Sequence, residues 1–154
     1  MNIWRLIAHH DRAKQEEALQ QMKSKNRICI GWSDADDLSK QNIESASNIS
    51  KLIKLKHSNN YHCGGPSLWN LYREMKIGDL VIVVIGHSKR VCVFEVIGDY
   101  IFSSKQEEIC GYPHQRNVRL TNINPDKLWD DIGAHVEKGQ NIRWTLALCK
   151  KTIT

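Results

Sequence analysis

Two apolar, β-rich runs separated by one short polar turn constrain this chain more than any other feature. Leu80–Ile85 is an unbroken aliphatic run of six residues, and residues 91–97 form a second run rich in valine and isoleucine. The five residues between them, Gly86-His87-Ser88-Lys89-Arg90, are polar and begin with glycine. This pattern predicts an antiparallel β-hairpin.

The remaining apolar patterns predict further strands and helices. Alternation indicates strands at residues 3–8, 28–32, 118–123 and 142–148, and helical spacing indicates helices at residues 12–24, 43–55, 66–75 and 125–132. Residues 56–65 have the composition of a loop. The order of elements is not a repeating βαβ unit. It predicts a single α+β domain over residues 1–154, with a curved mixed sheet or small barrel of about six strands flanked by helices.

Composition fits a globular protein. Of the 154 residues, 41% are hydrophobic and 25% are charged, which excludes wholesale disorder. The longest apolar run has only the six residues of Leu80–Ile85, too few for a membrane-spanning helix, and the N-terminus has no signal-peptide pattern. The five cysteines include no CxxC pair, which predicts reduced thiols and a cytoplasmic location.

The net charge of +5 is distributed unevenly along the chain. Counting Lys and Arg against Asp and Glu gives 10 and 7 in residues 1–60, 5 and 6 in residues 61–110, and 7 and 4 in residues 111–154. Both ends are therefore basic and the middle is slightly acidic. This distribution allows a basic face, but alone it does not separate a nucleic-acid-binding protein from one that is merely soluble.

No complete catalytic motif is present. The sequence lacks GxxxxGK[ST], GxSxG, HExxH and GxGxxG patterns. Asp79 and Glu95 are spaced like the acidic residues of metal-dependent nucleases, but the Glu-x-Lys that would complete the set has no lysine. Zinc-ligand residue types occur without CxxC spacing at His57, His62, Cys63, Cys110 and His114. We therefore expect no enzymatic activity, no metal and no cofactor.

An aromatic residue beside short polar side chains marks the end of the second strand. Trp32 is followed at once by Ser33 and Asp34. A flat ring next to hydrogen-bonding groups at a strand end is what a planar ligand needs, whereas the plainer alternative is a tryptophan of the core.

Three further segments place polar or aromatic side chains at strand ends. Tyr112 precedes His114 and Arg116, His9 follows the first strand, and the predicted hairpin turn supplies His87, Ser88, Lys89 and Arg90. The plainer alternatives are a tyrosine corner and solvated turns. If the segments meet in space, they form an aromatic pocket with a basic rim that contacts phosphate.

Several ordered motifs resemble the EVE-like domains of the PUA superfamily. They are Ile3-Trp4-Arg5-Leu6-Ile7-Ala8, Ile30-Gly31-Trp32-Ser33-Asp34 with Asp37-Leu38-Ser39, Tyr72-Arg73-Glu74-Met75-Lys76-Ile77-Gly78-Asp79 and Gly111-Tyr112-Pro113-His114-Gln115-Arg116-Asn117-Val118. The resemblance covers residues 3–123 and is greatest to the N-terminal DNA-reading modules of McrBC-type modification-dependent restriction proteins. It extends to the YTH domains, which read a methylated base in an aromatic cage.

The resemblance implies a barrel-like sheet with a pocket for a base flipped out of nucleic acid. It implies base-pocket roles for Trp32, Ser33, Asp34, Tyr112, His9, His87 and Ser88. Gly86 stands where EVE proteins have an aromatic residue, so one wall of the pocket is expected to be missing. Phosphate contacts are expected from Lys89, Arg90, His114, Arg116 and Arg119.

The leading hypothesis is therefore a non-enzymatic reader of a modified base in DNA, acting in restriction or another defence function, with any nuclease or motor supplied by a separate protein. Alternatives are a PUA-like RNA-binding protein and an interaction module in which every tryptophan is part of the core. A third is a small-molecule or nucleotide binder that uses the same pocket, or an enzyme acting on a nucleotide there with His87 or His114 as acid–base. A continuous basic rim favours a polymer, and a charge-neutral mouth favours a free ligand.

Overall fold

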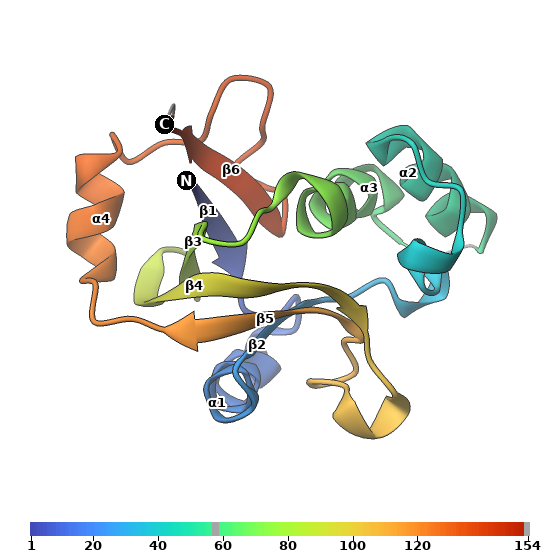
Figure 1. Ribbon diagram of the computed structural model, residues 1–154, viewed down its shortest axis with the longest axis horizontal. Helices are drawn as coiled ribbons and strands as arrows, with labels where there is room; N and C mark the ends of the chain where they lie inside the picture. The colour runs from blue at the N-terminus through green and yellow to red at the C-terminus, as the bar shows by residue number, and fades with distance from the viewer. Residues whose placement is uncertain (57–58, 153–154) are drawn as a thin grey trace.

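A computed structural model describes residues 1–56 and 59–152, which form a mixed six-stranded sheet with helices on both faces (Figure 1). The strand order is β2-β5-β4-β3-β1-β6. The strands are β1 (Asn2–Ile7), β2 (Arg27–Ile30), β3 (Leu80–Ile85), β4 (Lys89–Phe102), β5 (His114–Leu120) and β6 (Leu146–Lys151). Only β1 and β3 pair in parallel, and every other neighbouring pair is antiparallel. The predicted α+β class, hairpin and mixed sheet are confirmed, and the sheet is open rather than a closed barrel.

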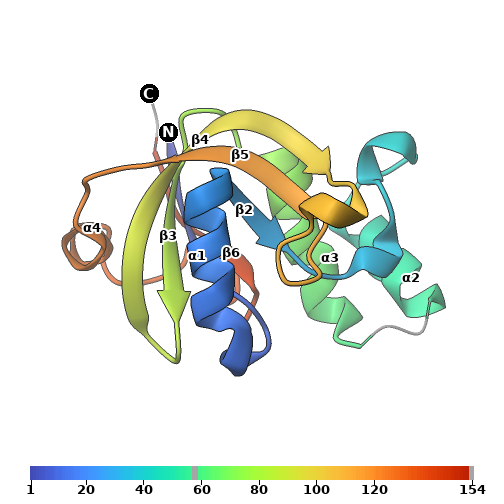
Figure 2. The ribbon, with the colours of Figure 1, turned by 90° about the horizontal axis from the view of Figure 1, so that it is seen from below.

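The helices form two layers. They are α1 (Gln15–Lys25), α2 (Ala46–Leu55), α3 (Tyr61–Trp69) and α4 (Pro125–Asp131), with a π-helical turn at Asn70–Glu74 and 3-10 turns at Arg12–Lys14, Ser33–Ala35, Leu38–Lys40 and Lys105–Glu107. α1, α2 and α3 contribute to the main core together with Trp4 and Leu6 of β1. α4 packs on the opposite face against Ile82 and Val84. The long strands β4 and β5 arch over α1 (Figure 2).

One buried carboxylate fixes the start of the sheet. Asp79 accepts hydrogen bonds of 2.9 Å from the backbone N–H of Asn2, the indole N–H of Trp4 and the backbone N–H of Lys76. Asp79 is 2% exposed, and Glu95 pairs instead with Arg119. Both carboxylate oxygens of Asp79 already accept hydrogen bonds, and these bonds help to join β1 to β3. This structural role of Asp79 explains the spacing of Asp79 and Glu95.

Two predicted boundaries are wrong for one shared reason: polar or glycine residues are buried with internal partners. β5 begins at His114, four residues before the predicted start, and α3 begins at Tyr61 inside the predicted loop. In α3, Gly65 lies against Ser50 of α2, where a Cβ atom would be 1.8 Å from the serine Oγ. The glycines that indicated a loop therefore permit the two helices to approach each other closely.

The last strand also differs from prediction. β6 begins at Leu146, so Ile142 and Trp144 precede the strand instead of alternating within it. The backbone from residue 142 to residue 144 forms a turn, with the Trp144 N–H bonded to the Asn141 carbonyl at 3.0 Å. All five cysteines are free thiols, as the sequence predicts.

Candidate functional site

Trp32 lies where the chain leaves β2, in a left-handed backbone conformation with φ 61° and ψ 51°. Its backbone carbonyl accepts hydrogen bonds from the His114 ring Nε2 and from the Ala35 N–H, both at 3.0 Å. Its indole N–H donates to the Asn59 carbonyl, also at 3.0 Å. A non-glycine residue is uncommon in this backbone region, so these bonds hold Trp32 in a conformation that it would otherwise seldom adopt.

One face of the Trp32 ring is covered by α3. A Cβ atom on Gly64 would be 2.8 Å from Cε2 and 2.9 Å from Cδ2 of the indole. These two carbons form the bond shared by the two rings, so an atom near both must lie over the ring face. The side chain is half-buried. Stacking of a ligand on Trp32 would therefore use the opposite face.

A second aromatic group, formed by the buried residues His9 and Tyr112, borders the same region as Trp32. The rings of His9 and Tyr112 stack with centroids 4.1 Å apart and an interplanar angle of 6°. His9 accepts from the Asp11 N–H at Nδ1, so its Nε2 carries the proton and donates to the Cys110 carbonyl, each at 3.0 Å. The Tyr112 hydroxyl bonds both the backbone N–H and the ring Nδ1 of His10. Every polar atom of this stack therefore has a defined partner.

Trp32 and the His9–Tyr112 stack line one pocket with a volume of about 490 Å³, within the range of roughly 300–1,000 Å³ typical of small-ligand sites. Ser33 and Asp34 line it too. The structure therefore brings together five of the seven residues predicted for a base pocket. The other lining residues are His10, Lys14, Gly31, Asn59, Asn60, Cys110, Gly111 and Thr145.

The aromatic walls are uncharged near neutral pH. Burial lowers the pKa of His9 and raises the pKa of Tyr112 to about 12. Burial also lowers the pKa of His114, behind Trp32, to about 4. The formal charges on the lining residues are those of Lys14 and Asp34, one of each sign. Flat neutral rings flanked by a few polar groups suit a planar, hydrogen-bonding ligand.

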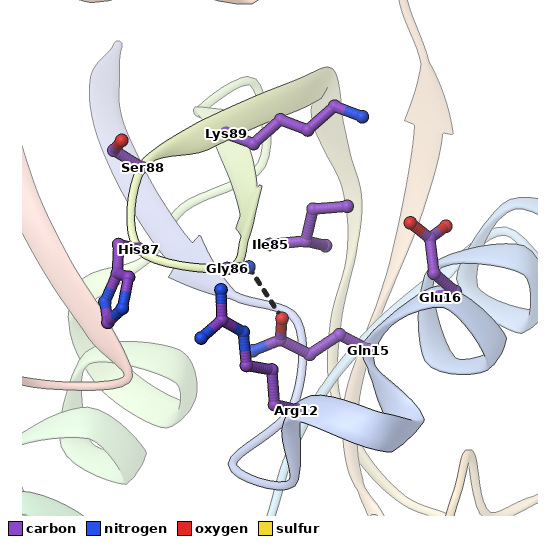
Figure 3. A pocket seen from close by; sticks show the side chains of 8 residues that line it. All are labelled: Arg12, Gln15, Glu16, Ile85, Gly86, His87, Ser88 and Lys89. Carbon is purple, nitrogen blue, oxygen red and sulfur yellow. Dashed lines mark hydrogen bonds between the residues drawn. The ribbon is translucent and has the colours of Figure 1, made fainter.

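His87 and Ser88 do not join this pocket. They lie on the exposed β3–β4 turn and line a neighbouring cavity with Arg12 and Gln15 (Figure 3). Gly86 has φ 60°, and its N–H donates to the Gln15 side-chain oxygen at 2.7 Å. The positive φ of this turn position favours glycine over an aromatic residue.

Two residues predicted to contact phosphate are instead buried. His114 is fully buried and bonds Tyr100 and Trp32. Arg116 is 3% exposed and donates to the carbonyls of Leu71, Met75 and Gly98. Neither side chain is accessible to a phosphate, because His114 and Arg116 lie in the buried first half of β5 rather than in a loop.

The remaining predicted phosphate contacts, Lys89, Arg90 and Arg119, do not line the pocket. Arg90 pairs with Asp126 of α4 at 2.7 Å and stacks over Trp129, and Arg119 pairs with Glu95. These ion pairs are on or beside the sheet face that α4 covers. Lys89 is exposed at the first position of β4. Of the five, only Lys89 remains both accessible and without an ion pair among the described residues.

Two basic residues at or near the pocket were not among the predicted site residues. Lys14 lines it, and Arg12 lines the adjoining cavity beside Gly86. Both residues lie between His9-His10 and α1. Their position between the end of a predicted strand and the start of a predicted helix could have indicated that they lie near the pocket. Asn59, Asn60 and Thr145 come from distant segments and had no local signal.

No group of three or more metal-ligand side chains suited to an ion occurs in residues 1–56 and 59–152. His57, one of the zinc-ligand types noted in the sequence, lies outside the described residues. Within the same described ranges, no helix has the length and apolar character needed to cross a membrane.

Comparison with known proteins identifies one family for this chain. A search of curated proteins found no match to the chain. Residues 4–139 match the family described as "Domain of unknown function (DUF8426)", a span that includes β1 to α4 and all of the pocket except Thr145. The chain therefore belongs to the DUF8426 family.

Proposed function

We propose that this protein is a non-enzymatic module that reads a modified, methylated base in DNA by accepting the flipped base in the Trp32 pocket. The observation that carries the proposal is the meeting of two aromatic walls, Trp32 and the His9–Tyr112 stack, around one pocket of about 490 Å³. Residues 9, 32 and 112 are far apart in sequence. Their convergence with Ser33 and Asp34 around one pocket supports a ligand site over the alternative that Trp32 serves only as a core residue.

The energetics of base flipping are compatible with such a site. Unstacking a base costs a few kcal/mol, and stacking on an aromatic side chain returns about 1–3 kcal/mol per base. Burial of one methyl group contributes only about 0.8 kcal/mol, so discrimination of a methylated base needs a fitted pocket. The bonds that fix the Trp32 backbone and the Tyr112 hydroxyl supply this preorganisation.

Contact with the polymer is assigned to the basic residues beside the pocket. Arg12 and Lys14 are exposed in the 3-10 turn before α1, and Lys89 is exposed at the start of β4, where it lines the same cavity as Arg12. Phosphate contacts of this kind would supply most of the affinity and make it sensitive to salt. We also propose that the open mixed sheet is of the EVE-like type, on the motifs that resemble that family. We propose a nuclease or motor as the partner of this module.

One observation favours a second candidate, a free nucleotide or similar small molecule. The pocket lining carries Asp34 as well as Lys14, so its basic character is not continuous. A carboxylate beside the mouth disfavours a phosphate backbone but can accept hydrogen bonds from the edge of a free base.

The test is fluorescence-anisotropy binding to short matched DNA duplexes that are unmodified or carry one methylated adenine or one methylated cytosine, at two salt concentrations. Wild type should prefer one modified duplex, and Trp32→Ala should lose that preference. Trp69→Ala is the matched control, because Trp69 is also half-buried and donates one hydrogen bond, to Glu74, but does not line the pocket.

Equal, salt-dependent binding to every duplex would reduce the site to a basic surface and direct the search to structured RNA. Absence of DNA binding at low salt, together with saturable quenching of tryptophan fluorescence by free methylated nucleosides, would favour the second candidate. Loss of base preference in Trp69→Ala as well as in Trp32→Ala would overturn the assignment of the pocket.

A further inference from the structure

A buried arginine with no ion pair to any described residue lies on the sheet face opposite the main core. Arg5 is in the middle of β1, and its neighbours Ile3 and Ile7 on the same face pack into the α4 side of the sheet. The Arg5 residue is 6% exposed. Arginine stays protonated in proteins, so a full positive charge is held where water has little access.

The protein satisfies only a small part of this guanidinium. One nitrogen, Nη2, donates to the Trp144 carbonyl, and this is the one side-chain hydrogen bond of Arg5 to a described residue. Nε is buried without a partner. No carboxylate within residues 1–56 and 59–152 forms an ion pair with Arg5. A guanidinium has five N–H donors in a planar fork, so several remain for another group.

The nearest titratable neighbour does not supply the missing negative charge. Cys149 of β6 interacts electrostatically with Arg5, but burial raises the pKa of its thiol to about 12. The thiol is therefore neutral near pH 7. Arg116, the other buried arginine, provides a contrast, because it donates to three backbone carbonyls and has Asp99 at 4.0 Å.

Arg5 lines a pocket with a volume of about 440 Å³. Apolar side chains form much of its wall: Ile7, Val84, Trp129 and Ile142. His87, Ser88 and Arg90 also line it, and Arg90 is partly neutralised by its 2.7 Å ion pair with Asp126. No acidic residue is among the lining residues. The pocket thus combines one buried, under-bonded cation with an apolar wall that includes an indole.

We propose that this pocket binds a small organic anion, a carboxylate or phosphate monoester attached to an apolar or aromatic group, with Arg5 as the principal anion ligand. The anionic head would complete the hydrogen bonds of the Arg5 fork, and the apolar body would pack on Trp129 and Ile142. His87 and Ser88, which stay outside the Trp32 pocket, would contact the anion from the turn. This site and the Trp32 pocket share no lining residue.

The test is NMR titration of the ¹⁵N-labelled protein in a buffer free of phosphate and carboxylate. Phenyl phosphate and phenylacetate are the probes, and the readouts are the Arg5 Nε–H and Trp129 indole N–H signals. We expect saturable shifts of both signals by at least one probe, with benzyl alcohol and inorganic phosphate binding at least tenfold more weakly. The stronger of the two anions identifies the head group as phosphate or carboxylate.

Three variants make the outcome decisive. Arg5→Met should weaken binding of the preferred anion at least tenfold, while Lys127→Met, which removes an exposed charge from α4, should leave it unchanged. Because Arg5→Met changes the interior, Ile142 provides a second test at an exposed position on the pocket wall. Ile142→Asp should weaken anion binding and Ile142→Lys should strengthen it, with benzyl alcohol affected equally by both.

Binding of benzyl alcohol as tight as that of the anions would overturn the proposal. So would anion affinity that is unchanged in Arg5→Met, or insensitive to the sign of the charge at residue 142, or an absence of saturable shifts at millimolar probe. Trp32→Ala should leave these titrations unaltered, so failure of this proposal and failure of the base-reading proposal are separately observable.

Discussion

The His114 ring connects a buried strand to the backbone carbonyl of Trp32. Its Nε2 donates to that carbonyl at 3.0 Å, and its Nδ1 accepts from the Tyr100 hydroxyl at 2.7 Å. The Tyr100 hydroxyl in turn accepts from the Leu38 N–H at 3.2 Å. The neutral ring, with its proton on Nε2, is the form that satisfies both neighbours. His114 therefore positions Trp32, although His114 itself does not line the pocket.

This arrangement predicts a pH dependence of stability. The pKa of His114 is lowered from 6.5 in the unfolded chain to about 4 in the folded protein, so the unfolded state binds the proton more readily. The stabilisation is complete above about pH 7 and is lost as the pH falls from 6.5 through 4. The two pKa values correspond to about 3 kcal/mol between pH 7 and pH 4.

His114→Gln isolates that contribution, because glutamine can still donate to the Trp32 carbonyl but does not titrate. Urea unfolding at pH 7, 5.5 and 4 should show the wild type losing about 3 kcal/mol more than the variant. His135→Gln, at an exposed position, is the control and should follow the wild type. Parallel curves for wild type and His114→Gln would show that His114 is not held neutral.

A second prediction concerns the glycine behind Trp32. In Gly64→Ala the new Cβ would be 2.7 Å from Ile53 Cδ1 and under 3 Å from the indole. Overpacking of this kind costs about 1–3 kcal/mol, which should outweigh the gain of roughly 1 kcal/mol from replacing a helical glycine. We expect a lower melting temperature and altered tryptophan fluorescence, neither of which should occur in His62→Ala on the same helix. An unchanged or raised melting temperature would show that the helix and indole are less closely packed.

A third prediction separates the structural role of Arg116 from a role in phosphate binding. Arg116→Met should lower the free energy of unfolding by about 3–5 kcal/mol, because it leaves buried carbonyls of Leu71, Met75 and Gly98 without donors. Arg116→Lys should recover only part of the loss, since an ammonium cannot reproduce the planar fork. Lys89→Met, at the exposed start of β4, should change stability by less than about 0.5 kcal/mol. Denaturant titration measures all three, and a stable Arg116→Met variant would contradict this assignment.

A fourth prediction tests the joint between β1 and β3. Asp79→Asn preserves shape but places an N–H₂ group opposite at least one of the three donors that Asp79 accepts from. We expect a loss of about 2–4 kcal/mol in the free energy of unfolding, with Asp131→Asn on the surface of α4 nearly neutral. A shift of the Trp4 indole N–H signal in the NMR spectrum would report the same change locally. Equal stability of the two variants would mean that the carboxylate is dispensable.

The apolar patterns predicted the strands and helices well where burial is apolar. β1 and α4 agree with prediction to within one residue at each end, and the β3–β4 hairpin is confirmed, but β4 runs from Lys89 to Phe102 where a strand over residues 91–97 was predicted. The start of β5 was missed because His114, Gln115 and Arg116 are buried with polar partners, and local sequence does not show where those partners come from.

The candidate pocket was predictable in part for a related reason. Trp32, Ser33 and Asp34 are adjacent in sequence at a strand end, so their grouping has a local signal. Asn59 and Thr145 reach the same pocket only through tertiary packing. The sequence likewise does not show that Arg5 forms no ion pair with a described residue, because this depends on how far the fold places the acidic residues from β1.

The position of β1 has a consequence for how the chain acquires its structure. β1 lies between β3 and β6, with Trp4 paired to Val81 on one side and to Leu148 on the other. β1 is synthesised first, but its partners β3 and β6 follow nearly eighty and nearly one hundred and fifty residues later in the chain. Such distant pairings favour slow folding, and they leave both edges of an apolar strand open during synthesis. Late completion of the sheet makes β1 the segment that most needs protection from aggregation on the ribosome.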